Sequence, residues 1–265
     1  MTSLLLLLFV PLLMWIAQTA MLARHGLPIR LRIDARDAPR DVRTVGRLVT
    51  QLSLLAVIVV YPLLIGRTPP HYYARLLPAD QSVWGLPHGA ASSVLFLGVL
   101  FLVWVSTDCL EIDVHQPRRR WQRRLVLLVP TALLGALIEE LLFRGVVMAD
   151  LLRWFPQAPY SVAAASALIF AGAHYVRGVK RRWTFPGHLV LGTLLCLAFL
   201  QTGSLWLSVG LHAGGILMIM GTRPFFAYRG PSWLTGASVF PFAGAVGIAG
   251  LAILTAFVVT HYGTR

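Results

Sequence analysis

Three ionisable residues lie inside a single apolar stretch of this sequence, between Thr131 and Arg153. Glu139 and Glu140 are adjacent, and Arg144 follows Glu140 by about one helical turn. A charged side chain at the centre of a membrane helix costs at least about 2.5 to 3.5 kcal/mol on insertion scales. Three of them together therefore indicate a functional site.

The chemistry of these residues depends on which partners they can reach. On a helix, Glu140 and Arg144 share a face and can pair, whereas Glu139 points about 100° away and is left for another partner. His174 and His212 are the polar candidates within later apolar stretches. A carboxylate beside a histidine can take a proton from water, and a second histidine can donate to the oxyanion of acyl transfer.

Helix geometry allows Glu139 and His174 to meet. If their two stretches form an antiparallel hairpin that turns near Pro156, Glu139 lies about 17 residues before the turn and His174 about 18 after it. At a rise of about 1.5 Å per residue, both side chains lie at nearly the same depth. His212 is expected nearer the midplane. We therefore expect a cavity that reaches from the cytoplasmic face to about mid-membrane.

Composition places the chain among membrane proteins. Of its 265 residues, 57% are hydrophobic and only 12% are charged, whereas charged residues make up about a quarter of a soluble domain. We predict an all-α polytopic membrane protein, with residues 1–265 as a single transmembrane domain. The net charge of +13 reflects basic residues in the connections, so we expect the lipid bilayer as a partner and no nucleic acid.

The apolar stretches predict about eight transmembrane helices around a polar intramembrane site. Most have the roughly 17 to 25 residues that a spanning helix needs, and the sixth is short enough to be tilted or partly interfacial. The stretches are Ser3–Leu22, Leu48–Ile65, Ala90–Ser106, Leu125 or Pro130 to Leu152, Tyr160–Val176, Gly187–Leu200, Leu205–Gly221 and Val239–Thr260.

Basic residues gather in every second connection, which places them on one side of the predicted membrane. They concentrate in the first, third, fifth and seventh connections, which are expected to be cytoplasmic, so both termini should lie outside. The first stretch has no Lys or Arg before it and is interpreted as an anchor with its N-terminus outside, rather than a cleaved signal peptide. The compact, arginine-rich and lysine-poor chain favours a bacterial plasma membrane.

The remaining cysteines and histidines are expected to have ordinary roles. Cys109 and Cys196 are the only cysteines and are interpreted as packed thiols, without a disulfide framework. Gly210 and Gly214 have the GxxxG spacing that permits close helix packing. Histidines in connections or at helix ends are expected to be solvated or interfacial: His25, His71, His88, His115, His188 and His261.

The polar motifs resemble those of the CPBP intramembrane proteases, the group that contains the Ras-converting CAAX prenyl endopeptidases. Glu139-Glu140-Leu-Leu-Phe-Arg144 matches EExxxR, Phe170-Ala-Gly-Ala-His174 matches FxxxH, and His212 matches the histidine of the third motif. Their order and spacing agree with the family, and the similarity covers residues 131–221, which we expect to form the protease-like core.

This resemblance implies an eight-span helical fold, with a peptide or protein substrate at the membrane as its partner. The protein would hydrolyse a peptide bond of that membrane-associated, prenyl-type or signal-type substrate. The resemblance also implies that Glu139 and His174 activate the water and that His212 is an oxyanion donor. Phe170 is a supporting residue, and Glu140 with Arg144 would hold the site together.

One position departs from the family pattern. The third motif is HxxxN or HxxxD, and here its last residue is Ile216. An isoleucine side chain cannot donate a hydrogen bond, and loss of one oxyanion donor typically costs about 2.7 to 4 kcal/mol. Ser208 is a candidate replacement. The alternative function is a catalytically weak or silent membrane protein that acts in bacteriocin self-immunity or as a scaffold.

Two further interpretations stay open. Glu139, His174 and His212 have the composition of a catalytic zinc site, but HExxH is absent, and the resemblance favours a glutamate-activated water. We therefore expect no cofactor and no metal, with zinc as the open alternative. A small transporter that uses the buried carboxylates as a proton relay is the third functional class, and proton-coupled uptake dependent on Glu139 would identify it.

Overall fold

The computed structural model describes residues 2–29, 38–113, 118–176, 183–236 and 240–263, although not the side chains of 118–121, 123–125 and 175–176. The chain forms two compact units, Met1–Tyr73 and Ala74–Arg265. Each unit is described by itself. The polar motifs all lie in the second unit.

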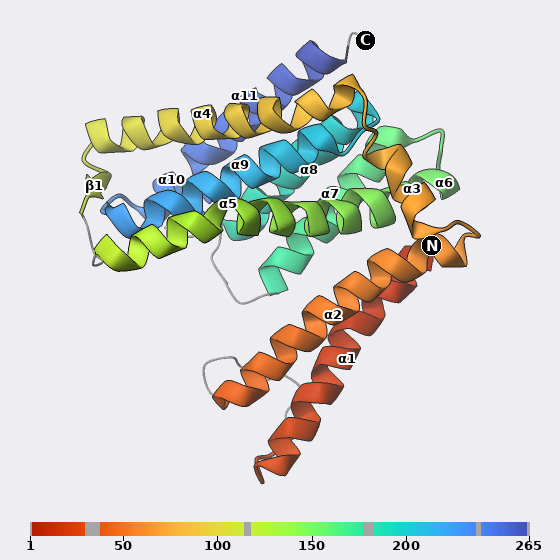
Figure 1. Cartoon of the computed structure of the whole chain (residues 1–265). Helices are drawn as coiled ribbons and strands as arrows, with labels where there is room; N and C mark the ends of the chain where they lie inside the picture. The colour runs from red at the N-terminus through yellow and green to blue at the C-terminus, as the bar shows by residue number, and fades with distance from the viewer. Residues whose placement is uncertain (1, 30–37, 114–117, 177–182, 237–239, 264–265) are drawn as a thin grey trace. The chain divides into compact units, whose positions relative to one another are not determined.

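The first unit is built around a pair of long helices, α1 (Thr2–Arg24) and α2 (Arg40–Leu64), which pack side by side (Figure 1). Val42 is fully buried, and Leu22 packs in the same small cluster. Other large apolar side chains of these helices face outward: Leu8 is 67% exposed and Leu52 is 64% exposed. Such an outward apolar surface fits contact with lipid, because only the groove between the two helices is needed for packing.

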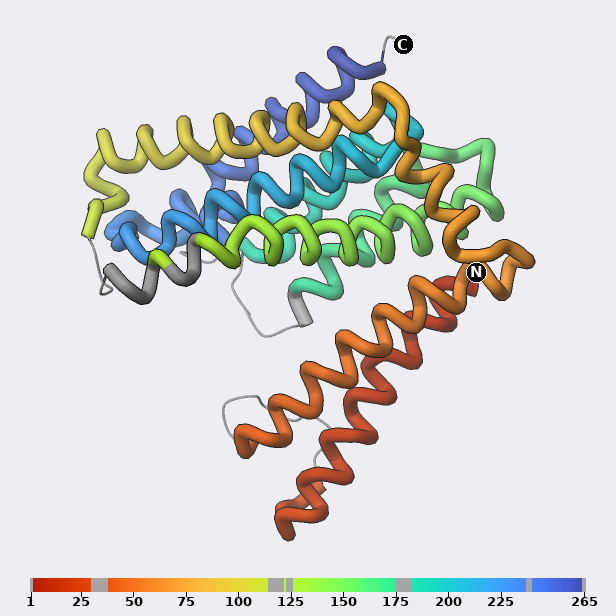
Figure 2. The backbone as a smooth tube through the Cα atoms, viewed as in Figure 1, coloured from red at the N-terminus to blue at the C-terminus, as the bar shows by residue number. Residues whose placement is uncertain are grey.

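The second unit holds the remaining helices, which begin and end as follows: α3 (Pro69–Leu76), which starts in the first unit, η1 (Gln81–Trp84), α4 (Gly85–Ser106), α5 (Arg118–Glu140), η2 (Leu141–Met148), α6 (Ala149–Trp154), α7 (Pro159–Val176), α8 (Thr184–Thr202), α9 (Trp206–Thr222), η3 (Arg223–Phe225), α10 (Ser232–Thr235), η4 (Pro241–Ala243) and α11 (Ala245–Tyr262). Helix α9 packs against both α4 and α5, and the three run side by side in Figure 2.

Glycines allow α4 and α9 to approach closely. A methyl group on Gly210 would lie 2.2 Å from the carbonyl oxygen of Leu86, and one on Gly214 would lie 2.5 Å from that of Ala90. The predicted packing role of these two glycines is thereby confirmed. Ser93 of α4 donates a hydrogen bond of 2.6 Å to the carbonyl oxygen of Leu211, which fixes α9 beside α4 next to His212.

The polar stretch forms one continuous helix made of α5, η2 and α6, and η2 is π-helical. The wider turn of a π segment often occurs at functional sites, and here the seven residues from Leu142 to Met148 are all buried. Ser166 of α7 donates a hydrogen bond of 3.3 Å to the carbonyl oxygen of Phe143 in this segment. Helix α6 ends at Trp154 and α7 begins at Pro159, so the hairpin predicted near Pro156 is confirmed.

The predicted class, an all-helical polytopic membrane protein, is confirmed. Among the described residues, six helices are long and apolar enough to cross a membrane by length and composition. Two of the eight predicted stretches form α7 and α9 and are not among these six; α9 has only 17 residues. The sixth stretch, predicted to be short, instead forms the 19-residue helix α8, which begins at Thr184 and is one of the six.

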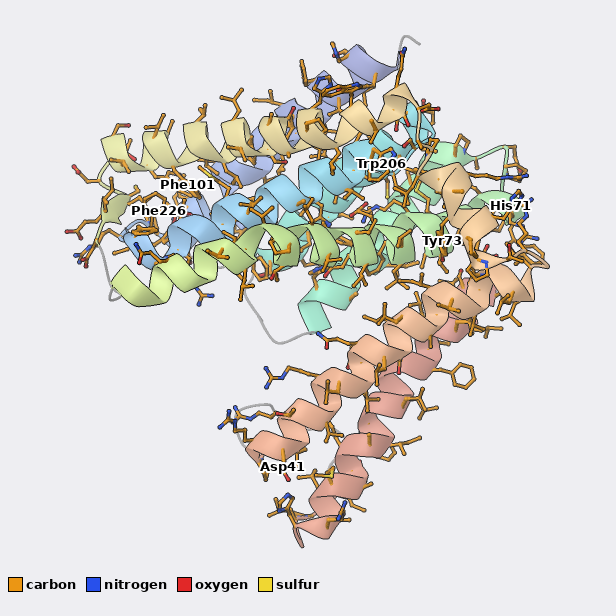
Figure 3. The ribbon with its side chains drawn as sticks, viewed as in Figure 1. Asp41, His71, Tyr73, Phe101, Trp206 and Phe226 are labelled. Atoms are coloured by element: carbon orange, nitrogen blue, oxygen red, sulfur yellow. The ribbon has the colours of Figure 1, made fainter. Side chains whose placement is uncertain are left out.

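A short antiparallel strand pair accompanies the helices and was not predicted. Strand β1 (Leu110–Ile112) pairs with β2 (Phe226–Tyr228), with Leu110 opposite Tyr228. The rings of Phe101 and Phe226 lie 5.1 Å apart in an edge-to-face arrangement, so β2 packs against the end of α4 (Figure 3). The strand pair thus fixes the chain that follows α9 to α4.

Candidate active site

Glu140 and Arg144 form a fully buried ion pair. Arg144 Nη1 donates a hydrogen bond of 3.0 Å to Glu140 Oε1, and both side chains have 0% exposure. Arg144 Nη2 donates to the carbonyl oxygen of Gly192 on α8 at 3.1 Å, and its guanidinium carbon lies 4.8 Å from the centre of the Phe170 ring. The pairing expected from the four-residue spacing is confirmed, and it connects the η2 segment to α7 and α8.

Glu140 also holds His212, a contact that the sequence did not indicate. His212 Nδ1 lies 2.8 Å from Glu140 Oε1, the same oxygen that Arg144 contacts. Since that carboxylate already accepts from a guanidinium, the natural assignment places the hydrogen on His212 Nδ1, which donates to Glu140. The orientation of the His212 ring is therefore set by Glu140, and its Nε2 atom is turned toward Glu139.

Glu139 lies where the two histidines converge. Its Oε2 atom is 3.4 Å from His174 Nε2 and 3.8 Å from His212 Nε2. The Glu139 side chain is 27% exposed and that of His174 is 16% exposed, in contrast to the sealed Glu140. The structure thus brings together Glu139, His174 and His212 from α5, α7 and α9. The Glu139 side chain is partly exposed, whereas that of Glu140 is fully enclosed.

The His174 ring is held by its own helix. Its Nδ1 atom lies 2.9 Å from the carbonyl oxygen of Phe170, one turn earlier. A carbonyl oxygen can only accept, so Nδ1 carries the hydrogen and Nε2 is the atom presented to Glu139. The Phe170 ring is fully buried and lies 4.3 Å from the His174 ring, so it also fixes the plane of the imidazole.

His188 belongs to this cluster, and the prediction that it is solvated or interfacial is wrong. It has 1% exposure on α8, and its ring stacks on that of His174 with centroids 4.6 Å apart and planes 21° from parallel. His188 is the second residue of the apolar stretch Gly187–Leu200. Its position inside an apolar stretch was the available signal.

Two other positions bear on the chemistry. Ile216, one turn after His212 on α9, occupies the place of the family Asn or Asp and is half-buried. Ser208 is fully buried, and its hydroxyl donates to the carbonyl oxygen of Leu205 at 3.0 Å.

No group of three or more His, Cys, Asp or Glu among the described residues has an arrangement that could hold a metal ion.

Both cysteines are free, as predicted: Cys196 is buried in α8, and Cys109 is half-buried beyond the end of α4. The other described histidines lie outside the cluster. His25, for example, contacts Asp41 at 2.6 Å on the surface of the first unit, whereas His115 lies outside the described residues.

The fold and site define a helical membrane protein in which two glutamates, an arginine and three histidines from separate helices meet in one cluster. Residues 121–218 match the family model described as type II CAAX prenyl endopeptidase Rce1-like. This stretch of the chain is therefore similar to an Rce1-like domain of the CPBP family, which is a protease family. The matched region contains all the site residues described above. Comparison with curated proteins and with solved structures finds no match.

Proposed function

We propose that this protein is an intramembrane endopeptidase that hydrolyses a peptide bond of a membrane-associated substrate with a water activated by Glu139 and His174. The observation that carries the proposal is the position of Glu139 Oε2, 3.4 Å from His174 Nε2 and 3.8 Å from His212 Nε2. A carboxylate close to two imidazoles supplies both a proton acceptor and a hydrogen-bond donor to one reacting group.

The first step is attack by water. A water bound beside Glu139 and His174 transfers a proton to the Glu139 carboxylate as its oxygen forms a bond to the carbonyl carbon of the substrate. His174 accepts a hydrogen bond from this water through Nε2, because Nδ1 carries the ring hydrogen and donates it to the carbonyl oxygen of Phe170. The Glu139 and His174 side chains are 27% and 16% exposed, while Glu139 Oε2 itself is buried beside the two imidazoles.

The negative oxygen of the tetrahedral intermediate needs a donor, and His212 is placed to be that donor. With Nδ1 bonded to Glu140, His212 can donate to the substrate only if Nε2 also carries a hydrogen, so the donating form is the imidazolium. Glu140 then supplies the balancing charge. The cluster of Glu139, Glu140, Arg144 and an imidazolium at His212 carries no net charge, which buried ionic groups require.

The last step separates the products. Glu139, now protonated, gives its proton to the nitrogen of the scissile bond as the carbon–nitrogen bond breaks, which leaves a carboxyl product and an amine product. The carboxylate is thereby regenerated. No group on the protein is consumed in this cycle, and Arg144 and Phe170 only hold the reacting residues in place.

Ile216 supports a second candidate function. Because this side chain has no hydrogen-bond donor, the oxyanion would rely on His212 and on backbone groups, and loss of one donor typically lowers kcat by about 10²- to 10³-fold. A catalytically silent CPBP-like protein, acting as a scaffold or in bacteriocin self-immunity, would retain the ion pair of Glu140 and Arg144 without needing Glu139.

The experiment compares new peptide termini in membranes from cells that carry the wild-type chain or Glu139→Gln at equal expression. Glu111→Gln is the matched control, because Glu111 is an exposed carboxylate that pairs with Arg229 outside the site. The protease proposal expects particular cleavage products to vanish only with Glu139→Gln. If all three profiles coincide while deletion of the gene still has a phenotype, the silent-scaffold function replaces it.

The proposal includes the orientation of the protein and the membrane in which it lies. The basic connections favour a topology with both termini outside and the site open toward the cytoplasm, in a bacterial plasma membrane. Single cysteines placed at the C-terminus and in the loop near Pro156 should react with a membrane-impermeant thiol reagent from outside. A cysteine between Asp113 and Arg118 should react only after the membrane is opened.

A further inference from the structure

We propose that His188 is a positioning residue of this site: its ring, stacked on that of His174, holds the His174 imidazole with Nε2 directed at Glu139. The catalytic meaning of this role rests on the proposed function, whereas the role itself concerns only the orientation of one ring. His188 lies outside the three motifs that resemble the family.

The geometry of the stack carries the proposal. The two ring centroids lie 4.6 Å apart and the planes differ by 21°, which is the separation and near-parallel arrangement of an offset aromatic stack. On another side of His174, the Phe170 ring lies 4.3 Å away. The imidazole of His174 is thus bounded by an aromatic ring from its own helix and by one from α8, so it has little room to rotate away from Glu139.

His188 is itself firmly held, as a positioning residue must be. Its Nδ1 atom donates a hydrogen bond of 2.7 Å to the carbonyl oxygen of Thr184, one turn earlier on α8. The edges and faces of two further aromatic rings enclose it, with centroids 4.6 Å away for Phe240 and 5.2 Å away for Phe242. His188 has 1% exposure, and this hydrogen bond and these ring contacts offset the cost of burying its polar ring.

Neither an ion pair nor simple filling of space accounts for His188 as well as the ring stack does. His188 has no ion-pair contact with the carboxylates among the described residues, and its nearest titratable contact is the ring of His174. A buried histidine needed only for volume would be replaceable by leucine. The stack instead predicts that an aromatic ring, rather than volume alone, is required at position 188.

The test is nuclear magnetic resonance of the full-length protein in detergent micelles, labelled with ¹⁵N at histidine rings and with the His174 signals assigned through a His174→Gln spectrum. In the wild type, His174 should show separate resonances for a protonated Nδ1 and an unprotonated Nε2. His188→Phe, which keeps a ring, should preserve them, and His188→Leu, which keeps volume alone, should merge them as the ring exchanges between orientations and tautomers. These spectra do not depend on any cleavage activity, so the role of His188 can fail or hold independently of the proposed protease function.

The control is His261→Leu, which removes a histidine stacked on Phe257 near the end of α11 and should leave the His174 signals unchanged. If the leucine variant does not fold, the wild type alone decides, because a cross peak between the ring hydrogens of His174 and His188 is required by their stacking. The proposal is overturned if that cross peak is absent, if His188→Leu keeps the wild-type pattern, if His188→Phe loses it, or if the control changes it.

Discussion

Substitution of Gly210 by alanine tests whether the close contact between α4 and α9 positions the site. The added methyl group would lie 2.2 Å from the carbonyl oxygen of Leu86, whereas ordinary contacts begin near 3.4 Å. Because the neighbour is backbone, the two helices must separate by about 1 Å rather than adjust a side chain. Overpacking of this kind typically costs about 1 to 3 kcal/mol.

The displacement also reaches the candidate site. Gly210 lies two residues before His212, whose contact with Glu140 is 2.8 Å long, and a change of about 1 Å removes it from hydrogen-bonding range. A misplacement of about 1 Å near reacting groups can lower a rate by about 10²-fold. Gly210→Ala should therefore be less stable and, as a protease, about 10²-fold slower than the wild type.

The assays are thermal unfolding in detergent micelles and the rate of cleavage of a peptide found by comparing membrane termini. Gly215→Ala is the matched control, because it lies on the same helix and a methyl group there meets nothing within 4 Å. It should be neutral or slightly stabilising, since alanine favours a helix over glycine by about 1 kcal/mol. If Gly210→Ala is as stable and as active as Gly215→Ala, the reasoning about helix packing is refuted.

Two other predictions concern charged residues. Arg144→Leu removes the partner of the buried Glu140 carboxylate and should lower stability by up to about 3 to 5 kcal/mol in thermal unfolding; adding Glu140→Gln should recover part of that loss, and no recovery would contradict the pairing argument. Arg229→Gln breaks an ion pair whose side chains are 65% and 51% exposed, so stability should change by less than about 1 kcal/mol, and a larger loss would show that the strand pair depends on it.

Much of the site followed from local sequence arguments. The spacing of Glu140 and Arg144 predicted their ion pair, and counting residues on either side of Pro156 predicted that Glu139 and His174 meet. Both arguments use only the helical repeat and a short hairpin. They succeed because the residues lie on one helix or on two helices joined by a four-residue turn.

What the sequence could not supply depends on contacts between distant segments. The bond from His212 to Glu140 joins residues 72 positions apart. Strands β1 and β2 have only three residues each, and they pair residues that lie still further apart in the sequence, such as Leu110 and Tyr228. The depth of a histidine in an apolar stretch can be counted, but the neighbour toward which it turns cannot, so His188 was placed wrongly. The π-helical segment η2 likewise has no marker in helix propensity.

The most direct test of the central claim is cleavage by purified protein in lipid vesicles, with a peptide identified from the comparison of termini, in water enriched in ¹⁸O. The account predicts that the wild type and Glu111→Gln release a carboxyl product containing one ¹⁸O atom, and that Glu139→Gln releases none above the rate without protein. Cleavage by Glu139→Gln at the wild-type rate would contradict the assignment of Glu139 as the group that activates water.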